Sequence, residues 1–309
     1  MSGHRRSVRI ASGALARAAG VIALCIAGSV VACGGAAERT STLPTVDDFG
    51  DTLAFGAPAT RVVSLNPVTT ELLFALGLGD RLVGRTSFDL FPDAARAVTD
   101  VGNGMQPNVE AVLGQRPDLV LLYASTSNRL AAQQLRAAGV MTLTLRTDRI
   151  ADLARITPLI AAALGAPETG RAVVDSVTAS LDEVRAMARP TEPITAFWHI
   201  WDPPLMTIGG GSYLSELLNV AGVTNVFGDT DAPSPQVALE EVARRDPQFI
   251  LASPTSAARI RSNPGWRSVR AVREGRVIEI DTTVVGRPGV RMGEAARYLR
   301  RVLVDVPPR

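Results

Sequence analysis

The side chains best suited to hold a flat, partly apolar molecule gather at the ends of predicted strands. The run Phe197–Trp201 contains two tryptophans and one histidine. Strand alternation places Trp198 on one face and His199 with Trp201 on the other, so one face packs in a core and the other meets a cleft. Tryptophan offers flat apolar area with a polar group, which suits large planar ligands. We expect Trp198, His199 and Trp201 to bind ligand, with His199 in a hydrogen-bonded role rather than as an axial metal ligand.

Two further candidate residues offer a phenol and a guanidinium. Tyr123 ends the apolar run Leu119–Tyr123, and in an open α/β sheet the end of a strand meets the ligand crevice. Arg287 lies in a loop with proline and glycine, from which a guanidinium could hold an anionic group bidentately. A solvated loop is the alternative for Arg287. Trp266 follows a proline–glycine turn and is expected to anchor packing instead.

The residue types that most enzymes need are missing. The chain contains no lysine, so Gly209–Ser212 cannot form a phosphate-binding P-loop. No G-x-S-x-G nucleophile motif is present. His199 is the only histidine after residue 32, which argues against a zinc site built from several histidines. A serine hydrolase that uses His199 and Asp202 is the remaining catalytic alternative. We expect a protein that is not an enzyme, with no catalytic residue, metal site or cofactor.

A predicted strand, a sharp turn and a predicted helix follow one another between residues 61 and 77. Val62–Leu65 is apolar and is typical of a buried strand. Pro67 suits the first turn of a helix, because its missing N–H is not needed there. Gly77 ends the helical pattern. We expect Asn66 and Pro67, which form the turn, to contact ligand at the carboxyl end of the strand.

The two halves of the chain resemble each other. Predicted strands and helices alternate, which indicates mostly parallel sheets with helices on their faces. The segment that begins at Glu71 matches the one at Glu216, and Glu110 matches Glu240, each followed by a proline seven residues later. A long helix is predicted over residues 166–189, between the halves. Two similar lobes predict a ligand cleft between them.

The first 32 residues have the marks of an export signal. A basic start precedes a small, apolar run that reaches Val31. Val30-Val31-Ala32-Cys33 resembles a bacterial lipobox, at which Cys33 is lipidated; a plain signal peptide is the alternative. Removing residues 1–32 leaves 28 arginines against 30 acidic residues, and this net charge of −2 gives no support for nucleic-acid binding. No cysteine other than Cys33 would remain for a disulfide or a metal site.

The chain is therefore expected to have five parts. They are a signal peptide (1–32), a lipid-anchored tether and lead-in (33–57), an N-terminal α/β lobe (58–165), a connecting helix (166–189) and a C-terminal α/β lobe (190–309). The expected fold class is α/β, with a central, mostly parallel sheet in each lobe.

Short segments spread over about residues 46–304 carry a resemblance to a known family. They are Val46-Asp47-Asp48, Pro58–Leu65, Glu71 with Leu76-Gly77, Arg116–Val120, Gly209–Leu218, Ala221-Gly222, Asn225–Phe227, Pro235–Val237, and Trp266 with Ala271–Val277. Together they resemble the substrate-binding proteins of ABC importers for vitamin B12, iron–siderophores and haem, the class III periplasmic binding proteins. The resemblance implies two α/β lobes joined by a single rigid helix, here 166–189, with little hinge motion.

The same resemblance implies partners and a location. In this family a glutamate on each lobe docks onto arginines of the permease dimer, which works with its ATPase, and the matching positions are Glu110 and Glu240. An ordinary first-turn glutamate that complements the helix dipole is the alternative at both positions. The protein is then expected to be a monomer, exported and lipid-anchored in the cell envelope, facing the periplasm or the outside of a single-membrane cell.

Among the members of this family, the vitamin B12 binders look nearest. Phe88 resembles their aromatic loop, and Tyr123 stands where they place a tryptophan. Gly104 and Ser234 occupy positions where a B12 binder can have tryptophan, so the aromatic surface is thinner here. We expect a cobalamin-like metal chelate as ligand. A ferric siderophore or haem stays open, and Arg287 favours an anionic ligand.

Overall fold

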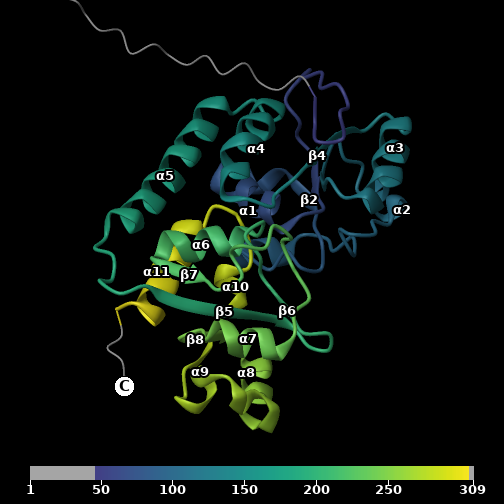
Figure 1. Ribbon diagram of the computed structural model, residues 1–309. Helices are drawn as coiled ribbons and strands as arrows, with labels where there is room; N and C mark the ends of the chain where they lie inside the picture. The colour runs from purple at the N-terminus through teal and green to yellow at the C-terminus, as the bar shows by residue number, and fades with distance from the viewer. Residues whose placement is uncertain (1–45, 306–309) are drawn as a thin grey trace, which may run out of the picture. The chain divides into compact units, whose positions relative to one another are not determined.

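Residues 46–305 form two sheets, one before and one after the longest helix of that region, α5 (Pro167–Ala186) (Figure 1). These features are seen in a computed structural model, which describes residues 46–305. The predicted signal peptide and Cys33 lie outside the described residues. We call the elements before α5 the N-terminal lobe and those after it the C-terminal lobe. The arrangement confirms the predicted α/β class with a mostly parallel sheet in each lobe.

The sheet of the N-terminal lobe is parallel throughout, in the order β2-β1-β3-β4. Its strands are β1 (Val62–Ser64), β2 (Leu82–Gly84), β3 (Leu119–Tyr123) and β4 (Met141–Leu145). Its helices are α1 (Pro67–Ala75), α2 (Val109–Gly114), α3 (Arg129–Ala137) and α4 (Ile150–Ala163). Apolar clusters cover both faces of this sheet, which is why β3 is a nearly continuous apolar run.

The sheet of the C-terminal lobe has the order β6-β5-β8-β9, with β7 also paired to β5. Its strands are β5 (Ile194–Trp201), β6 (Met206–Thr207), β7 (Val223–Asn225), β8 (Phe249–Ala252) and β9 (Val277–Glu279). Its helices are α6 (Tyr213–Ala221), α7 (Leu239–Arg245), α8 (Pro254–Ser262), α9 (Arg270–Arg273), α10 (Thr282–Val285) and α11 (Met292–Leu303). All pairings are parallel except that of β5 with β6.

Helix α5 packs against α4 of the N-terminal lobe and against α11 of the C-terminal lobe. Its buried side chains include Val177, Leu181 and Val184, which recur at helical spacing. The helix is three residues shorter at its end than the predicted 166–189, because Met187 already adopts an extended backbone. Pro190 follows, and a proline disfavours helical geometry in the residue before it.

Helices α1 and α6 begin in the same way, which explains the similarity of their sequences. The Asn66 side chain accepts a hydrogen bond from the Val68 N–H, at 3.0 Å, and so caps α1. The Ser212 hydroxyl accepts from the Leu214 N–H, at 3.2 Å, and caps α6. Each lobe therefore presents a capped helix close to the carboxyl end of its sheet.

Candidate ligand-binding site

A cavity of about 630 Å³ lies between the two lobes, and both contribute to its lining. From the N-terminal lobe come the end of β3 and the residues that follow β4. From the C-terminal lobe come the start of α6 and the loop after α10. The lining residues are Tyr123, Arg146, Thr147, Asp148, Arg149, Asp152, Gly211, Ser212, Tyr213, Leu214, Pro233, Gly286 and Pro288. We call this space the inter-lobe cavity. It stands where parallel α/β sheets bind ligands, beyond the carboxyl ends of their strands.

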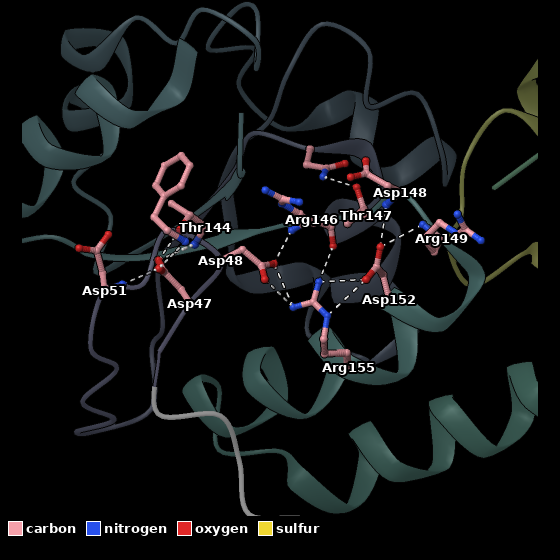
Figure 2. Close-up of polar contacts among 12 residues, drawn as sticks. Asp47, Asp48, Asp51, Thr144, Arg146, Thr147, Asp148, Arg149, Asp152 and Arg155 are labelled. Carbon is pink, nitrogen blue, oxygen red and sulfur yellow. Dashed lines mark hydrogen bonds and ion pairs between the residues drawn. The ribbon is translucent and has the colours of Figure 1, made fainter. Parts of the chain in front are cut away.

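The segment 146–149 is fixed by a carboxylate on α4. One oxygen of Asp152 accepts hydrogen bonds from the backbone N–H groups of Asp148, at 2.8 Å, and Arg149, at 3.0 Å. The other oxygen accepts from the guanidinium of Arg155, at 3.0 Å (Figure 2). Asp152 of helix α4 therefore fixes residues 146–149, so this wall of the cavity is not a free loop.

Tyr123, which sequence reasoning selected, lines this cavity. Its hydroxyl donates a hydrogen bond of 2.6 Å to a carboxylate oxygen of Asp148. Burial raises the pKa of Tyr123 to about 12, and the hydrogen bond and negative charge of Asp148 act in the same direction. The positive charge of Arg146 acts in the opposite direction. Tyr123 therefore presents a neutral phenol to the cavity near neutral pH.

Titrating the protein with base gives a direct check of this bond. Burial and the hydrogen bond to Asp148 make the folded state favour the neutral phenol, so the stability that depends on it is fully present below the ordinary tyrosine pKa of 10.0 and is lost as the pH rises through about 12. Phenolate absorbance should show two late-titrating tyrosines, because burial also raises the pKa of Tyr213, and one of the two late steps should disappear in Tyr123→Phe. In Asp148→Asn, Tyr123 should titrate earlier. A titration curve that is unchanged in both variants would contradict the raised pKa of Tyr123.

Asn66 and Pro67 adjoin the cavity without lining it. Asn66 is buried, and besides capping α1 its side chain donates a hydrogen bond of 3.1 Å to the hydroxyl of Thr147. Pro67 occupies the first turn of α1, as its geometry predicts. The turn thus supports the cavity wall at Thr147. Direct contact of Asn66 or Pro67 with ligand stays a prediction.

Arg287 and Arg291 reach from the C-terminal lobe to the N-terminal lobe. Arg287 donates a hydrogen bond of 2.7 Å to the carbonyl oxygen of Phe88. Arg291 donates to both carboxylate oxygens of Glu71, at 3.1 and 3.0 Å, and its guanidinium stacks over the ring of Phe91, 3.9 Å from the centroid. Sequence reasoning assigned Arg287 to an anionic ligand, whereas the structure places its guanidinium on protein groups.

In a second inter-lobe ion pair, the N-terminal lobe supplies the arginine and the C-terminal lobe supplies the carboxylate. Arg149, at the start of α4, donates to Glu216 of α6 at 2.7 Å, and the backbone N–H of Ile150 donates to the other oxygen at 2.8 Å. Glu71 and Glu216 are the two glutamates that correspond between the halves of the sequence. Each lobe therefore supplies a carboxylate that binds an arginine of the other lobe, and Arg149, which belongs to one of these pairs, lines the inter-lobe cavity.

Three predicted aromatic or imidazole ligands lie in other surroundings. Trp198 is buried in the core of the C-terminal lobe, with Leu217 and Leu251. His199 lines a separate cavity of about 340 Å³ together with Trp266, and burial lowers its pKa. Trp201 is 59% exposed, and its indole N–H donates to the Pro203 carbonyl. None of the three lines the inter-lobe cavity.

Phe88 is exposed in the loop after β2 and does not line the inter-lobe cavity either. At Gly104, the neighbouring backbone leaves no room for any side chain. A Cβ atom at Gly104 would lie 2.2 Å from the carbonyl oxygen of Leu65. A tryptophan therefore cannot replace Gly104 on this backbone, so aromatic cover from that position is excluded.

Sequence reasoning missed most of the cavity wall. Residues 146–149 follow a strand directly, so the rule that selected Tyr123 would also have selected them. Tyr213 follows the glycine-rich run Gly209–Ser212, which sequence reasoning tested as a phosphate loop and used for the family resemblance but did not assign to the ligand site. It lines the cavity while its hydroxyl donates to the carbonyl of Val285.

Comparison with known proteins identifies the family. The periplasmic binding protein family matches residues 62–284, which include both sheets and the helix between them. The chain belongs to the periplasmic binding proteins. The protein named "Vitamin B12-binding protein" of Vibrio cholerae serotype O1 is 28% identical over 80% of this chain and 90% of its own length. The "Uncharacterized ABC transporter substrate-binding lipoprotein YvrC" of Bacillus subtilis is 30% identical over 85% of this chain and 87% of its own.

Solved structures agree with this assignment. The vitamin B12-binding protein BtuF of Vibrio cholerae superposes with a TM-score of 0.68 at 27% identity, over 79% of this chain and 96% of its own. The haem-binding protein RhuT from Roseiflexus sp. RS-1 gives a TM-score of 0.73 at 25% identity, over 80% and 98%. These similarities confirm the resemblance to substrate-binding proteins of the vitamin B12, iron and haem class.

On this periplasmic binding protein the two predicted docking glutamates occupy equivalent places. Glu110 lies in the first turn of α2, which is capped by Asn108, and Glu240 lies in the first turn of α7. Both side chains are exposed, and neither forms an ion pair within residues 46–305. No helix in that part of the chain is both long and apolar enough to cross a membrane.

Proposed function

We propose that this protein captures a cobalamin-like metal chelate in the inter-lobe cavity and delivers it to the permease dimer of an ABC importer. The observation that carries the proposal is the cavity itself, which lies beyond the carboxyl ends of β3 and β4 and is completed by the other lobe. Relatives named as vitamin B12-binding proteins, at 28% identity, favour a corrinoid. The chelate is cargo and not a cofactor, and no catalytic step is assigned to the protein.

The proposal includes an anchor and a docking face. Cys33 would carry lipid and hold the binding protein, as a monomer, at a membrane of the cell envelope, and the relative named as a lipoprotein in Bacillus subtilis supports this part. Glu110 and Glu240 would meet arginines of the permease, one from each lobe. Ion pairs at such a face fix orientation and speed association.

A ferric siderophore or haem is the second candidate ligand. The cavity lining contains two tyrosines, four charged side chains and no tryptophan, so it offers little of the aromatic area that a large planar chelate can use. Solved haem-binding proteins share this fold, one of them at 25% identity. A polar, charged lining suits a chelate whose edge carries oxygen groups.

Titration of the purified mature protein with cyanocobalamin, haemin and a ferric siderophore tests the function. Quenching of intrinsic fluorescence should reveal one chelate that binds at micromolar or lower concentration. Leu214→Trp, which adds bulk to the cavity lining, should weaken that binding, whereas the exposed substitution Leu130→Trp should not. Absence of binding for all three chelates would refute the proposed function.

A further inference from the structure

The inter-lobe cavity contains one charged side chain that no protein group within residues 46–305 binds. Four lining residues are charged: Arg146, Asp148, Arg149 and Asp152. Arg149 pairs with the carboxylate of the other lobe, Asp152 binds Arg155, and Asp148 accepts from the tyrosine hydroxyl. The Arg146 guanidinium makes no hydrogen bond or ion pair within residues 46–305, and no dashed line reaches it in Figure 2.

The backbone of Arg146 is held on both sides although its side chain is not. Its N–H donates a hydrogen bond of 2.6 Å to Asp48, and its carbonyl accepts one of 3.1 Å from Arg155. Asp48 and Arg155 form an ion pair of 2.9 Å with each other. Asp48 belongs to the lead-in, and the backbone N–H of Asp48 donates a hydrogen bond to the Thr144 carbonyl of β4. Arg146 therefore extends from a fixed point, which lowers the entropy cost of placing its guanidinium on a ligand.

We propose that Arg146 recognises an anionic oxygen group, a carboxylate or a phosphate, on the edge of the bound chelate, and that Asp48 and Arg155 position it. This inference rests on the proposed function, because it assigns the ligand chemistry of the same cavity. Guanidinium matches carboxylate and phosphate with two parallel hydrogen bonds. Arg146 thus takes the role that sequence reasoning gave to Arg287, whose guanidinium is bound to protein groups.

A substitution of Asp148 tests whether the cavity binds an anionic or a cationic group. Its carboxylate lines the same cavity and repels an anion that approaches Arg146. Replacing it by asparagine keeps an acceptor for the tyrosine hydroxyl and removes the negative charge. Anion binding should therefore tighten severalfold in Asp148→Asn, whereas a site for a cationic group would weaken.

Citrate is the probe for the anion site, since it needs no knowledge of the natural chelate. Backbone amide spectra of the full mature protein, titrated with citrate at constant ionic strength, should shift saturably at residues 146–149 and Tyr123. Arg146→Gln should weaken this binding about tenfold or more, the value of one charge-assisted hydrogen bond. Arg301→Gln removes the same charge from an exposed site on α11 and should leave it unchanged.

Two results would overturn the assignment of Arg146. One is the absence of citrate shifts in the cavity, and the other is equal binding by Arg146→Gln and Arg301→Gln. Asp48→Ala should weaken citrate binding and Asp48→Asn, which retains an acceptor for the Arg146 N–H, should restore part of it. Thermal melts of each variant show whether the fold is intact, so that lost binding is not confused with unfolding.

Chelate pairs separate this inference from the proposed function. The pairs are cyanocobalamin with dicyanocobinamide, which lacks the phosphodiester, and haemin with its dimethyl ester, which lacks free carboxylates. The member that carries the free phosphodiester or carboxylate group should bind the wild type more tightly, and the preference should collapse in Arg146→Gln only. Citrate binding without chelate binding would refute the proposed cargo and keep the anion site. Chelate binding with the same affinity in Arg146→Gln would keep the cargo and refute the role of Arg146.

Discussion

Replacing Arg291 by methionine should lower the free energy of unfolding by about 3 kcal/mol, because it leaves the buried carboxylate of Glu71 with only its longer ion pair to Arg287, at 3.9 Å. The Glu71 side chain is 2% exposed and the Arg291 side chain 15%, so water cannot replace the lost ion pair. Methionine retains apolar contact with the ring of Phe91, which limits the packing loss. Equilibrium denaturation in urea measures the change.

A double variant distinguishes the buried charge from other effects. Glu71→Leu with Arg291→Met removes both charges and should recover at least half of the loss, since paired apolar replacement of buried ions is often neutral. The matched comparison is Arg149→Met, which breaks the more exposed pair with Glu216 and should cost only about 1 kcal/mol or less. Equal losses in Arg291→Met and Arg149→Met would contradict the argument from burial.

Reversing the two proposed docking glutamates, with Glu110→Arg and Glu240→Arg together, should reduce chelate uptake at least about tenfold while the affinity for the chelate stays unchanged. Like charges brought together across an interface cost several kcal/mol, and the two helices lie outside the lining of the inter-lobe cavity. Uptake in cells that depend on this importer, together with chelate titration of the purified variant, measures both quantities.

The control for this experiment carries the same change in charge elsewhere. Asp175 and Glu192 are exposed and form no ion pair within residues 46–305, so reversing both alters net charge equally. Their reversal should leave uptake near that of the wild type. If the control lost as much uptake as the Glu110 and Glu240 variant, the effect would be one of overall charge. A parallel fall in chelate affinity would place the two glutamates in binding rather than docking.

Local sequence signals were enough to predict the parts of the fold that depend on neighbours in the chain. The turn at Asn66-Pro67 could be predicted because a cap and a first-turn proline act within a few residues. The correspondence of Glu71 with Glu216 was visible for the same reason, as both lie early in helices that begin alike. Their partners were not visible, because Arg291 and Arg149 lie far away in the chain.

The side of a strand that meets a ligand could not be decided from alternation. Alternation separates Trp198 from His199 correctly, but only the packing of α6 and β8 shows that Trp198 enters the core. The exclusion of a side chain at Gly104 depends on the carbonyl of Leu65, a close approach that no local pattern encodes. Likewise, the hydrogen bond from Arg287 to the carbonyl oxygen of Phe88 joins the two lobes, and no local pattern predicts it.

The reciprocal ion pairs have a consequence for the independence of the two halves. Each lobe contains a glutamate and an arginine whose partners are in the other lobe, so neither lobe is electrostatically complete when separated. The burial of Glu71 makes this dependence strong for the N-terminal lobe. Halves that resemble each other are often treated as modules that can be exchanged or expressed singly. Here each lobe requires the other, so the two lobes should unfold as one cooperative unit.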